Sequence, residues 1–191
     1  MTNFVGKRID NVRIIAGEHK GRKLKTLTGS DTRPTLDKVR GAVFNALHDV
    51  GGARVLDMFG GSGAMALEAL SRGAESCVIV DNSPKAMAII EANTEALGYT
   101  AKVDLRLGDF RTALKRGEYF DLIILDPPYG QGLLPESIRL VQKLGLLRSS
   151  GIIVAETSAQ APEYGDISQL CLIKEKQYGA AKILYYRFDE E

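Results

Sequence analysis

The chain has 191 residues, and its 25 lysines and arginines nearly balance its 24 aspartates and glutamates, which gives a formal net charge of +1. This balance excludes a protein that clings to nucleic acid over a uniformly basic surface, so any basic surface must be local. With 45% hydrophobic residues, a chain of this length is expected to bury one core and to form one globular domain. Cys77 and Cys171 lie far apart without a CxxC spacing, which argues against a disulfide scaffold and a cysteine-ligated metal site, and no metal is expected.

The apolar runs of the chain are short. Residues 122–125 and 152–155 fall far below the roughly 18 residues that a membrane span needs. The N-terminus also lacks an apolar signal core. We therefore expect a cytoplasmic protein without a membrane partner, and a monomer by default.

Basic residues concentrate at the N-terminus, where the first 40 residues contain ten lysines and arginines against four acidic residues. Such a run is either a solvated face or an arm that contacts phosphates. Three cations beside Gly21 favour the arm, because glycine lets the backbone approach a polyanion closely. Residues 13–16 and 24–27 flank a glycine-containing turn and predict a short hairpin, so residues 1–34 are expected to form the arm and residues 35–191 the main domain. The candidate RNA-binding residues are Lys20, Arg22, Lys23, Lys25, Arg33 and Arg40.

Helices and strands alternate along the main domain. Thr35 can cap a helix whose apolar residues recur at three- and four-residue spacing until Gly51 and Gly52. Further helices are predicted at residues 64–71, 84–97, 110–115 and 135–144, and strands at residues 55–58, 77–80, 103–107, 122–125 and 152–155. This rhythm is typical of an α/β fold with a mostly parallel sheet and helices on both faces. The last two strands, at residues 170–174 and 183–188, are joined by a connection that is short enough only for an antiparallel pair.

A glycine-rich loop follows the first of these strands, at the sheet edge where ligands bind in such folds. Gly61, Gly63 and Ala66 match the G-x-G-x-x-A pattern of dinucleotide sites, and Asp81 ends the second strand. Asp57 argues against NAD, because a pyrophosphate docked there would meet a like charge. S-adenosylmethionine carries an ammonium and a sulfonium, so Asp57 can favour it, while Asp81 can accept hydrogen bonds from its ribose hydroxyls.

Two residues after the third strand have alternative interpretations. Asp109 can accept a hydrogen bond from the adenine amino group of the cofactor while Phe110 packs on the adenine face. Alternatively, Asp109 only caps the next helix.

The most informative stretch is Asp126-Pro127-Pro128-Tyr129, at the end of the fourth strand. Pro127 restricts Asp126 to extended conformations, so the Asp126 carboxylate and the Asp126 and Pro127 carbonyls form a rigid cluster of acceptors. An exocyclic base amine has the opposite polarity, and Tyr129 can stack on its ring. The pattern predicts methyl transfer from a sulfonium to nitrogen, accelerated mainly by positioning.

These motifs resemble those of class I S-adenosylmethionine-dependent methyltransferases. The likeness rests on Asp57-x-Phe59-x-Gly61-x-Gly63, Asp81, Asp109 and Asp126-Pro127-Pro128-Tyr129. Other stretches resemble the small-subunit ribosomal RNA methyltransferase D family more specifically: Arg13-Ile14-Ile15-Ala16-Gly17, Lys20-Gly21-Arg22, Thr32 to Arg40, Phe44-Asn45 and Leu67 to Ala74. Two departures are mild, since Gly60 stands where alanine is common and Asp81 where glutamate is common.

The resemblance implies a Rossmann-like class I methyltransferase fold, with a seven-stranded sheet that ends in an antiparallel hairpin. It also implies methylation of guanine N2 in 16S ribosomal RNA, either naked or within an assembling small subunit, and a segment around Thr35 that folds back near the cofactor. Alternatives are an N6-adenine methyltransferase on RNA or DNA, a noncatalytic RNA-binding module and an NAD-linked oxidoreductase.

Overall fold

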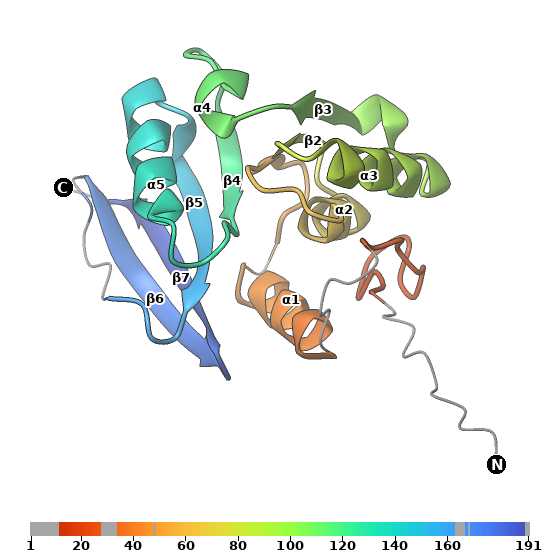
Figure 1. Cartoon of the computed structure of the whole chain (residues 1–191), viewed down its shortest axis with the longest axis horizontal. Coiled ribbons are helices and arrows are strands. Elements are labelled where there is room, and N and C mark those ends of the chain that lie inside the picture. Colours follow the sequence, from red (N-terminus) through yellow and green to blue (C-terminus); the bar gives the residue numbers. More distant parts are fainter. Residues whose placement is uncertain (1–11, 28–33, 48, 163–166, 168, 190–191) are drawn as a thin grey trace.

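In the computed structural model the described residues are 12–27, 34–47, 49–162, 167 and 169–189, with only the backbone described for residues 34–36. Seven strands form one sheet in the order β3-β2-β1-β4-β5-β7-β6 (Figure 1). The strands are β1 (Arg54–Asp57), β2 (Ser76–Asp81), β3 (Val103–Leu107), β4 (Phe120–Leu125), β5 (Leu147–Ser158), β6 (Leu170–Tyr178) and β7 (Ala181–Phe188). The helices are α1 (Pro34–Leu47), α2 (Ala64–Ser71), α3 (Pro84–Ala96), the 3-10 turn η1 (Thr100–Lys102), α4 (Phe110–Ala113) and α5 (Leu133–Leu144).

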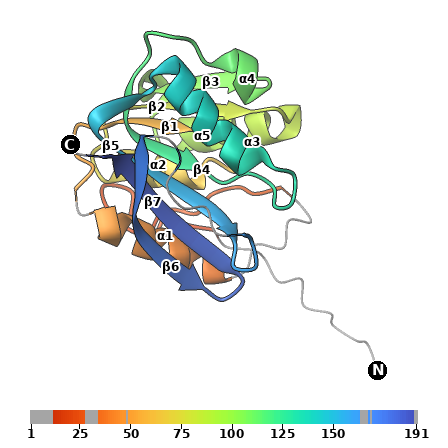
Figure 2. The same cartoon turned by 90° about the vertical axis from the view of Figure 1, so that its left-hand side faces the viewer.

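The pairing of the strands confirms the predicted topology. Strands β1 to β5 pair in parallel, whereas β7 is antiparallel to both β5 and β6. Figure 2 shows the long β6–β7 hairpin at the opposite end of the sheet from β3. The seven-stranded α/β fold inferred from the sequence is therefore confirmed.

Alternating side chains of the strands pack on the two faces of the sheet. On β4, Leu122 and Ile124 join one core cluster, while Ile123 and Leu125 join the other. Helices α1, α2 and α3 cover the first face, and α4 and α5 cover the second. This period of two follows from the pleat, and it explains why the buried strands read as continuous apolar runs.

The segment of residues 12–27 packs against the main domain. Val12, Ile14 and Leu24 are buried in the core cluster that α2 and α3 cover. Arg13 and Lys23 form one antiparallel bridge, and the Ile14 amide donates to the Arg22 carbonyl at 2.9 Å. The predicted hairpin is thus present as a short pairing without regular strands.

Glu68 of α2 holds residues 12–27 against the main domain. Its fully buried carboxylate accepts hydrogen bonds from the amides of Ile15 at 2.7 Å and Ala16 at 3.1 Å, and it pairs with Arg72 at 2.8 Å. A buried carboxylate is stable only when its lone pairs are satisfied in this way. The contact brings together two stretches that carry the family resemblance, residues 13–17 and residues 67–74.

Gly17 completes the contact between the two stretches. It has a φ of 82°, and a Cβ atom there would lie 1.7 Å from the Ser71 carbonyl oxygen. Only glycine permits both the left-handed backbone and this close approach.

Candidate active site

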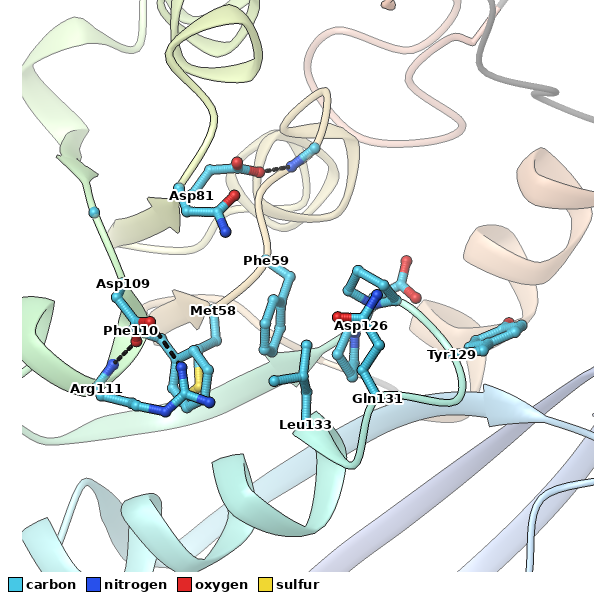
Figure 3. Close-up of a pocket in the computed structure, with 15 residues that line it drawn as sticks. Met58, Phe59, Asp81, Asp109, Phe110, Arg111, Asp126, Tyr129, Gln131 and Leu133 are labelled. Atoms are coloured by element: carbon cyan, nitrogen blue, oxygen red, sulfur yellow. Dashed lines mark hydrogen bonds and ion pairs between the residues drawn. The ribbon is translucent and has the colours of Figure 1, made fainter.

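A cavity of about 720 Å³ opens at the carboxyl ends of strands β1, β2 and β4 and beside the loop that follows β3 (Figure 3). Its walls combine the predicted cofactor residues with the predicted catalytic turn. The lining residues are Met58, Phe59, Gly61, Asp81, Asn82, Gly108, Asp109, Phe110, Arg111, Asp126, Pro127, Pro128, Tyr129, Gln131 and Leu133.

The glycine loop is held against the end of β2 by Asp81. One carboxylate oxygen of Asp81 accepts from the Gly61 amide at 2.8 Å, and the other accepts from the Ser83 amide at 2.8 Å. Each oxygen keeps a second lone pair for a ligand, because a carboxylate oxygen can accept two hydrogen bonds. Asp81 therefore shapes the loop and still presents acceptors at the cavity wall.

Glycine at position 60, where the family resemblance leads one to expect alanine, fits the local packing. A Cβ atom on Gly60 would lie 2.5 Å from the Ile79 Cγ2 atom and 2.8 Å from the Ile90 Cδ1 atom. The methyl group of an alanine would displace these core side chains.

Asp57 lies beneath the loop and faces a second, smaller cavity of about 150 Å³, which shares Phe59, Gly61 and Asp126 with the large one. The residue is 2% exposed, and burial raises its pKa from 3.8 to about 7. Amides of the loop and of α2 donate to its carboxylate and oppose that rise. Asp57 is thus a poorly solvated acid that a nearby cation would stabilise.

Asp109 has the capping role that was one of its two interpretations. Its Oδ1 atom accepts from the Arg111 amide at 2.8 Å, and its Oδ2 atom pairs with the Arg111 side chain at 2.7 Å. Arg111 also forms a bidentate ion pair with Glu136 of α5, in which its Nε and Nη2 atoms each lie 2.6 Å from a carboxylate oxygen. The Phe110 ring packs on Phe59, with 5.3 Å between centroids, so the two aromatic side chains form an apolar part of the cavity wall.

The turn after β4 places Asp126 between the two cavities, which it lines together with Phe59 and Gly61. Part of the residue is exposed at the cavity mouth, yet desolvation by the surrounding protein raises the pKa of its carboxyl group to about 8, and the negative charges of Glu156 and Asp57 add to the rise. Asp126 is therefore suited both to accept hydrogen bonds and to take up a proton near neutral pH.

Tyr129 is half exposed, and its hydroxyl donates to Glu156 Oε1 at 2.6 Å. Burial and this hydrogen bond raise the pKa of Tyr129 well above its usual range. Glu156 was missed in the sequence, although it directly follows the apolar run 152–155, as Asp126 follows 122–125. Arg111, Asn82 and Gln131 were also missed, and no local pattern marks them.

Acidic side chains recur along this edge of the sheet. Asp57 and Asp81 end β1 and β2, Asp109 and Asp126 follow β3 and β4, and Glu156 lies two residues before the end of β5. Such an edge repels phosphates and attracts cations. It disfavours the pyrophosphate of NAD and fits a ligand that carries positive charge.

Four of the predicted RNA-binding residues are exposed on the described segment of residues 12–27: Lys20, Arg22, Lys23 and Lys25. Arg40 differs, because it is only 4% exposed; its guanidinium pairs with Asp37 at 2.7 Å and bonds to the Arg13 carbonyl. We therefore remove Arg40 from the candidate RNA surface and assign it a role in holding residues 12–27 to the domain. Arg33 and the side chain of Thr35 lie outside the described residues.

Within the described part of the chain, no helix is long and apolar enough to cross a membrane. The same residues contain no group of three or more His, Cys, Asp or Glu side chains that could hold a metal ion.

Comparison with known proteins agrees with this geometry. A sequence profile of the family described as "Conserved hypothetical protein 95" matches residues 12–187. The chain is 36% identical over 181 residues to the YlbH protein of Bacillus subtilis, which covers 92% of this chain and 98% of that protein. It is 35% identical over 152 residues to Ribosomal RNA small subunit methyltransferase D of Escherichia coli, and this match covers 78% of this chain and 76% of that protein.

A solved structure of the Escherichia coli protein yhhF superposes with a TM-score of 0.84 at 27% identity, and the match covers 95% of this chain and 99% of that one. Together, the family profile, the named relatives and the shared fold show that the chain belongs to the ribosomal RNA small subunit methyltransferase D family of class I methyltransferases.

Proposed function

We propose that this protein transfers a methyl group from S-adenosylmethionine to the exocyclic N2 of a guanine in 16S ribosomal RNA. The observation that carries the proposal is one cavity of about 720 Å³ whose walls include both Asp81, on the cofactor side, and the Asp126–Tyr129 turn. Relatives that are named for methylation of small-subunit ribosomal RNA support the substrate class. The choice of guanine N2 rests on the family resemblance of the sequence.

The described residues fit S-adenosylmethionine, which supplies an electrophilic methyl group on a sulfonium when it is bound. The spare lone pairs of Asp81 suit the two ribose hydroxyls, and the Phe59–Phe110 wall suits the adenine face. Asp57 suits the ammonium end, because a cation near a buried carboxylate relieves the cost of its charge. An NAD pyrophosphate would instead face a row of carboxylates, so we do not favour the oxidoreductase.

In this mechanism Asp126 and the Pro127 carbonyl accept hydrogen bonds from the target amine and draw its lone pair out of conjugation with the ring. S-adenosylmethionine, held in this cavity, would supply the methyl group to N2 and keep the electron pair of the broken bond on its sulfur, while Asp126 would accept the N2 proton that leaves. The raised pKa of about 8 makes the ionised carboxylate a stronger base than an ordinary aspartate, so it can take up this proton once it is itself ionised. Tyr129 stacks on the base, and positioning supplies most of the acceleration.

RNA binding is assigned to cations away from the acidic edge. The exposed side chains of Lys20, Arg22, Lys23 and Lys25 are available for phosphate contacts. We propose that residues 1–34, whose segment 12–27 packs on the main domain, make these contacts. The named relatives are bacterial, and we propose that this protein meets its ribosomal RNA substrate, free or in an assembling small subunit, in the cytoplasm.

The experiment is transfer of tritiated methyl groups from S-adenosylmethionine to purified small-subunit RNA and to assembling particles. We expect Asp126→Ala to lower the rate by roughly 100-fold or more, as expected when one preorganised polar group at a reacting centre is lost. The exposed Asp189→Ala is the matched control and is expected to keep its rate. Near-normal turnover of Asp126→Ala would show that the amine is oriented by other groups. If the wild type transferred no methyl groups, the proposed activity would be refuted and the alternative of a noncatalytic RNA-binding module would be favoured.

A further inference from the structure

Glu156 lies beside Asp126 because of the register of the sheet. Leu125 ends β4 and pairs with Ala155 of β5, so the next residues along the two parallel chains are Asp126, in the turn after β4, and Glu156 of β5. On its other side Glu156 pairs with Ile183 of β7. Since β5 is flanked by strands on both sides, the backbone that carries Glu156 is fixed independently of the turn after β4.

Tyr129 is placed less firmly by its own chain. It leaves 48% of its surface exposed, and the next turn contains Gly130 and Gly132, both with positive φ. Glycines leave the backbone more conformational freedom than other residues do, so little in the turn itself orients the ring. Its hydroxyl reaches Glu156 Oε1 at 2.6 Å, the short distance that is typical of a hydroxyl bound to a charged carboxylate.

This hydrogen bond joins Tyr129, which lines the large cavity, to Glu156, which lines the smaller one. In the view of Figure 3, Asp126 lies between Phe59 and Tyr129, and all three residues line the large cavity. Both Asp126 and Glu156 line the smaller cavity, and the charge of Glu156 contributes to the raised pKa of Asp126. Glu156 is therefore close to the reacting end of the site without lining the large cavity.

We propose that Glu156 is a positioning residue for methyl transfer: it anchors the Tyr129 hydroxyl from β5, so that the ring is preorganised to stack on the base whose amine Asp126 holds. This inference rests on the proposed function, in which Tyr129 stacks on the target. Glu156 acts through Tyr129 and does not touch the substrate. Because the anchor orients a base that the RNA-binding surface already holds, its loss reduces the rate more than the affinity for RNA.

The kinetic test uses three single variants at Glu156 and Tyr129, one double variant, and Glu175→Ala as a control. We expect Glu156→Ala to lower kcat about 10-fold with the KM for RNA changed less than threefold. Glu156→Gln recovers most of this loss, because its amide oxygen still accepts the tyrosine hydroxyl. Tyr129→Phe removes the hydroxyl that donates the hydrogen bond, and we expect it to lower kcat as much as Glu156→Ala does. We expect the double variant Glu156→Ala/Tyr129→Phe to be no slower than either single variant.

Three outcomes would overturn the proposal. Losses that multiply in the double variant would mean that Glu156 acts without Tyr129. A Glu156→Gln variant as slow as Glu156→Ala would mean that charge matters and the hydrogen bond does not. A comparable loss in Glu175→Ala, which removes an exposed glutamate of β6, would mean that the effect is not specific to the site.

A substrate-free measurement separates this inference from the proposed function. In a protein labelled on its tyrosine rings, the NMR signal of Tyr129 is assigned by its absence in Tyr129→Phe. We expect Glu156→Ala to shift that signal and Glu156→Gln to leave it close to its wild-type position. An unshifted signal in Glu156→Ala would refute the anchor even if guanine methylation is confirmed, whereas a shifted signal in a protein without guanine methylation would refute only the proposed substrate.

Discussion

The stability of the Asp57→Asn variant relative to the wild type is expected to increase as the pH rises. Asp57 is 2% exposed, and burial raises its pKa from 3.8 to about 7. Between these two pH values the folded protein retains a proton that the unfolded chain has released. The contribution of Asp57 to the free energy of unfolding therefore decreases as the pH rises through this window.

The magnitude follows from the width of the window. Each pH unit changes the free energy of unfolding by roughly 1.4 kcal/mol, and two units of the window lie above pH 5, so the wild type loses about 2–3 kcal/mol between pH 5 and pH 8 through this group. An asparagine side chain cannot ionise, so the Asp57→Asn variant escapes this loss. The altered hydrogen bonds of the amide cost the same at both pH values and cancel in the comparison.

Urea unfolding at pH 5 and pH 8 measures this effect directly. The difference in the free energy of unfolding between Asp57→Asn and the wild type is expected to be about 2–3 kcal/mol more favourable to the variant at pH 8 than at pH 5. Asp189→Asn, which changes an exposed carboxylate in the same way, is the control. A difference that is equal at the two pH values would refute the raised pKa, and with it the argument that Asp57 needs a cation.

Three further outcomes are expected. Asp81→Ala removes the proposed ribose acceptor and weakens binding of S-adenosylmethionine in calorimetry by about 1.5–3 kcal/mol; unchanged affinity, or tight binding of NAD, would contradict this role. With both substrates subsaturating, the rate rises about 10-fold from pH 7 to pH 9, because Asp126, with a pKa of about 8, must be ionised to accept a proton; a flat profile would exclude that step. Neutralising Lys20, Arg22 and Lys23 together flattens the salt dependence of RNA affinity while cofactor affinity survives, and an unaltered slope would make these cations a solvated surface.

Local signals in the sequence were sufficient for most of the fold. Apolar runs and glycine stops located the strands, and the short connection before Ala181 predicted the antiparallel hairpin. Element lengths depended on contacts distant in sequence. Helix α4 ends at Ala113, two residues earlier than predicted, where Leu114 adopts an extended backbone and is buried in the core. Strand β5 begins at Leu147 because Phe120 pairs with it across a bulge, which no local pattern reveals.

The candidate site shows the same division between local and long-range information. The sequence placed Asp81, Asp109 and Asp126 at or just after the ends of three strands, and because parallel strands align their carboxyl ends, these residues line one cavity. A charge count, however, cannot tell an exposed cation from Arg40, whose burial depends on Asp37 and on residues 13–16. Glu156 had the same local signal as Asp126, but its bond to Tyr129 appears only once β4 and β5 are set side by side.

The central claim is that the acceptor cluster at Asp126 directs a methyl group to an exocyclic guanine amine, and the identity of the methylated nucleoside tests it most directly. Small-subunit RNA is incubated with the protein and methyl-labelled S-adenosylmethionine, digested to nucleosides and separated by chromatography with mass detection. We predict label in N2-methylguanosine alone, and its loss with Asp126→Ala. Label in N6-methyladenosine, or in any nucleoside modified on carbon or oxygen, would contradict the account.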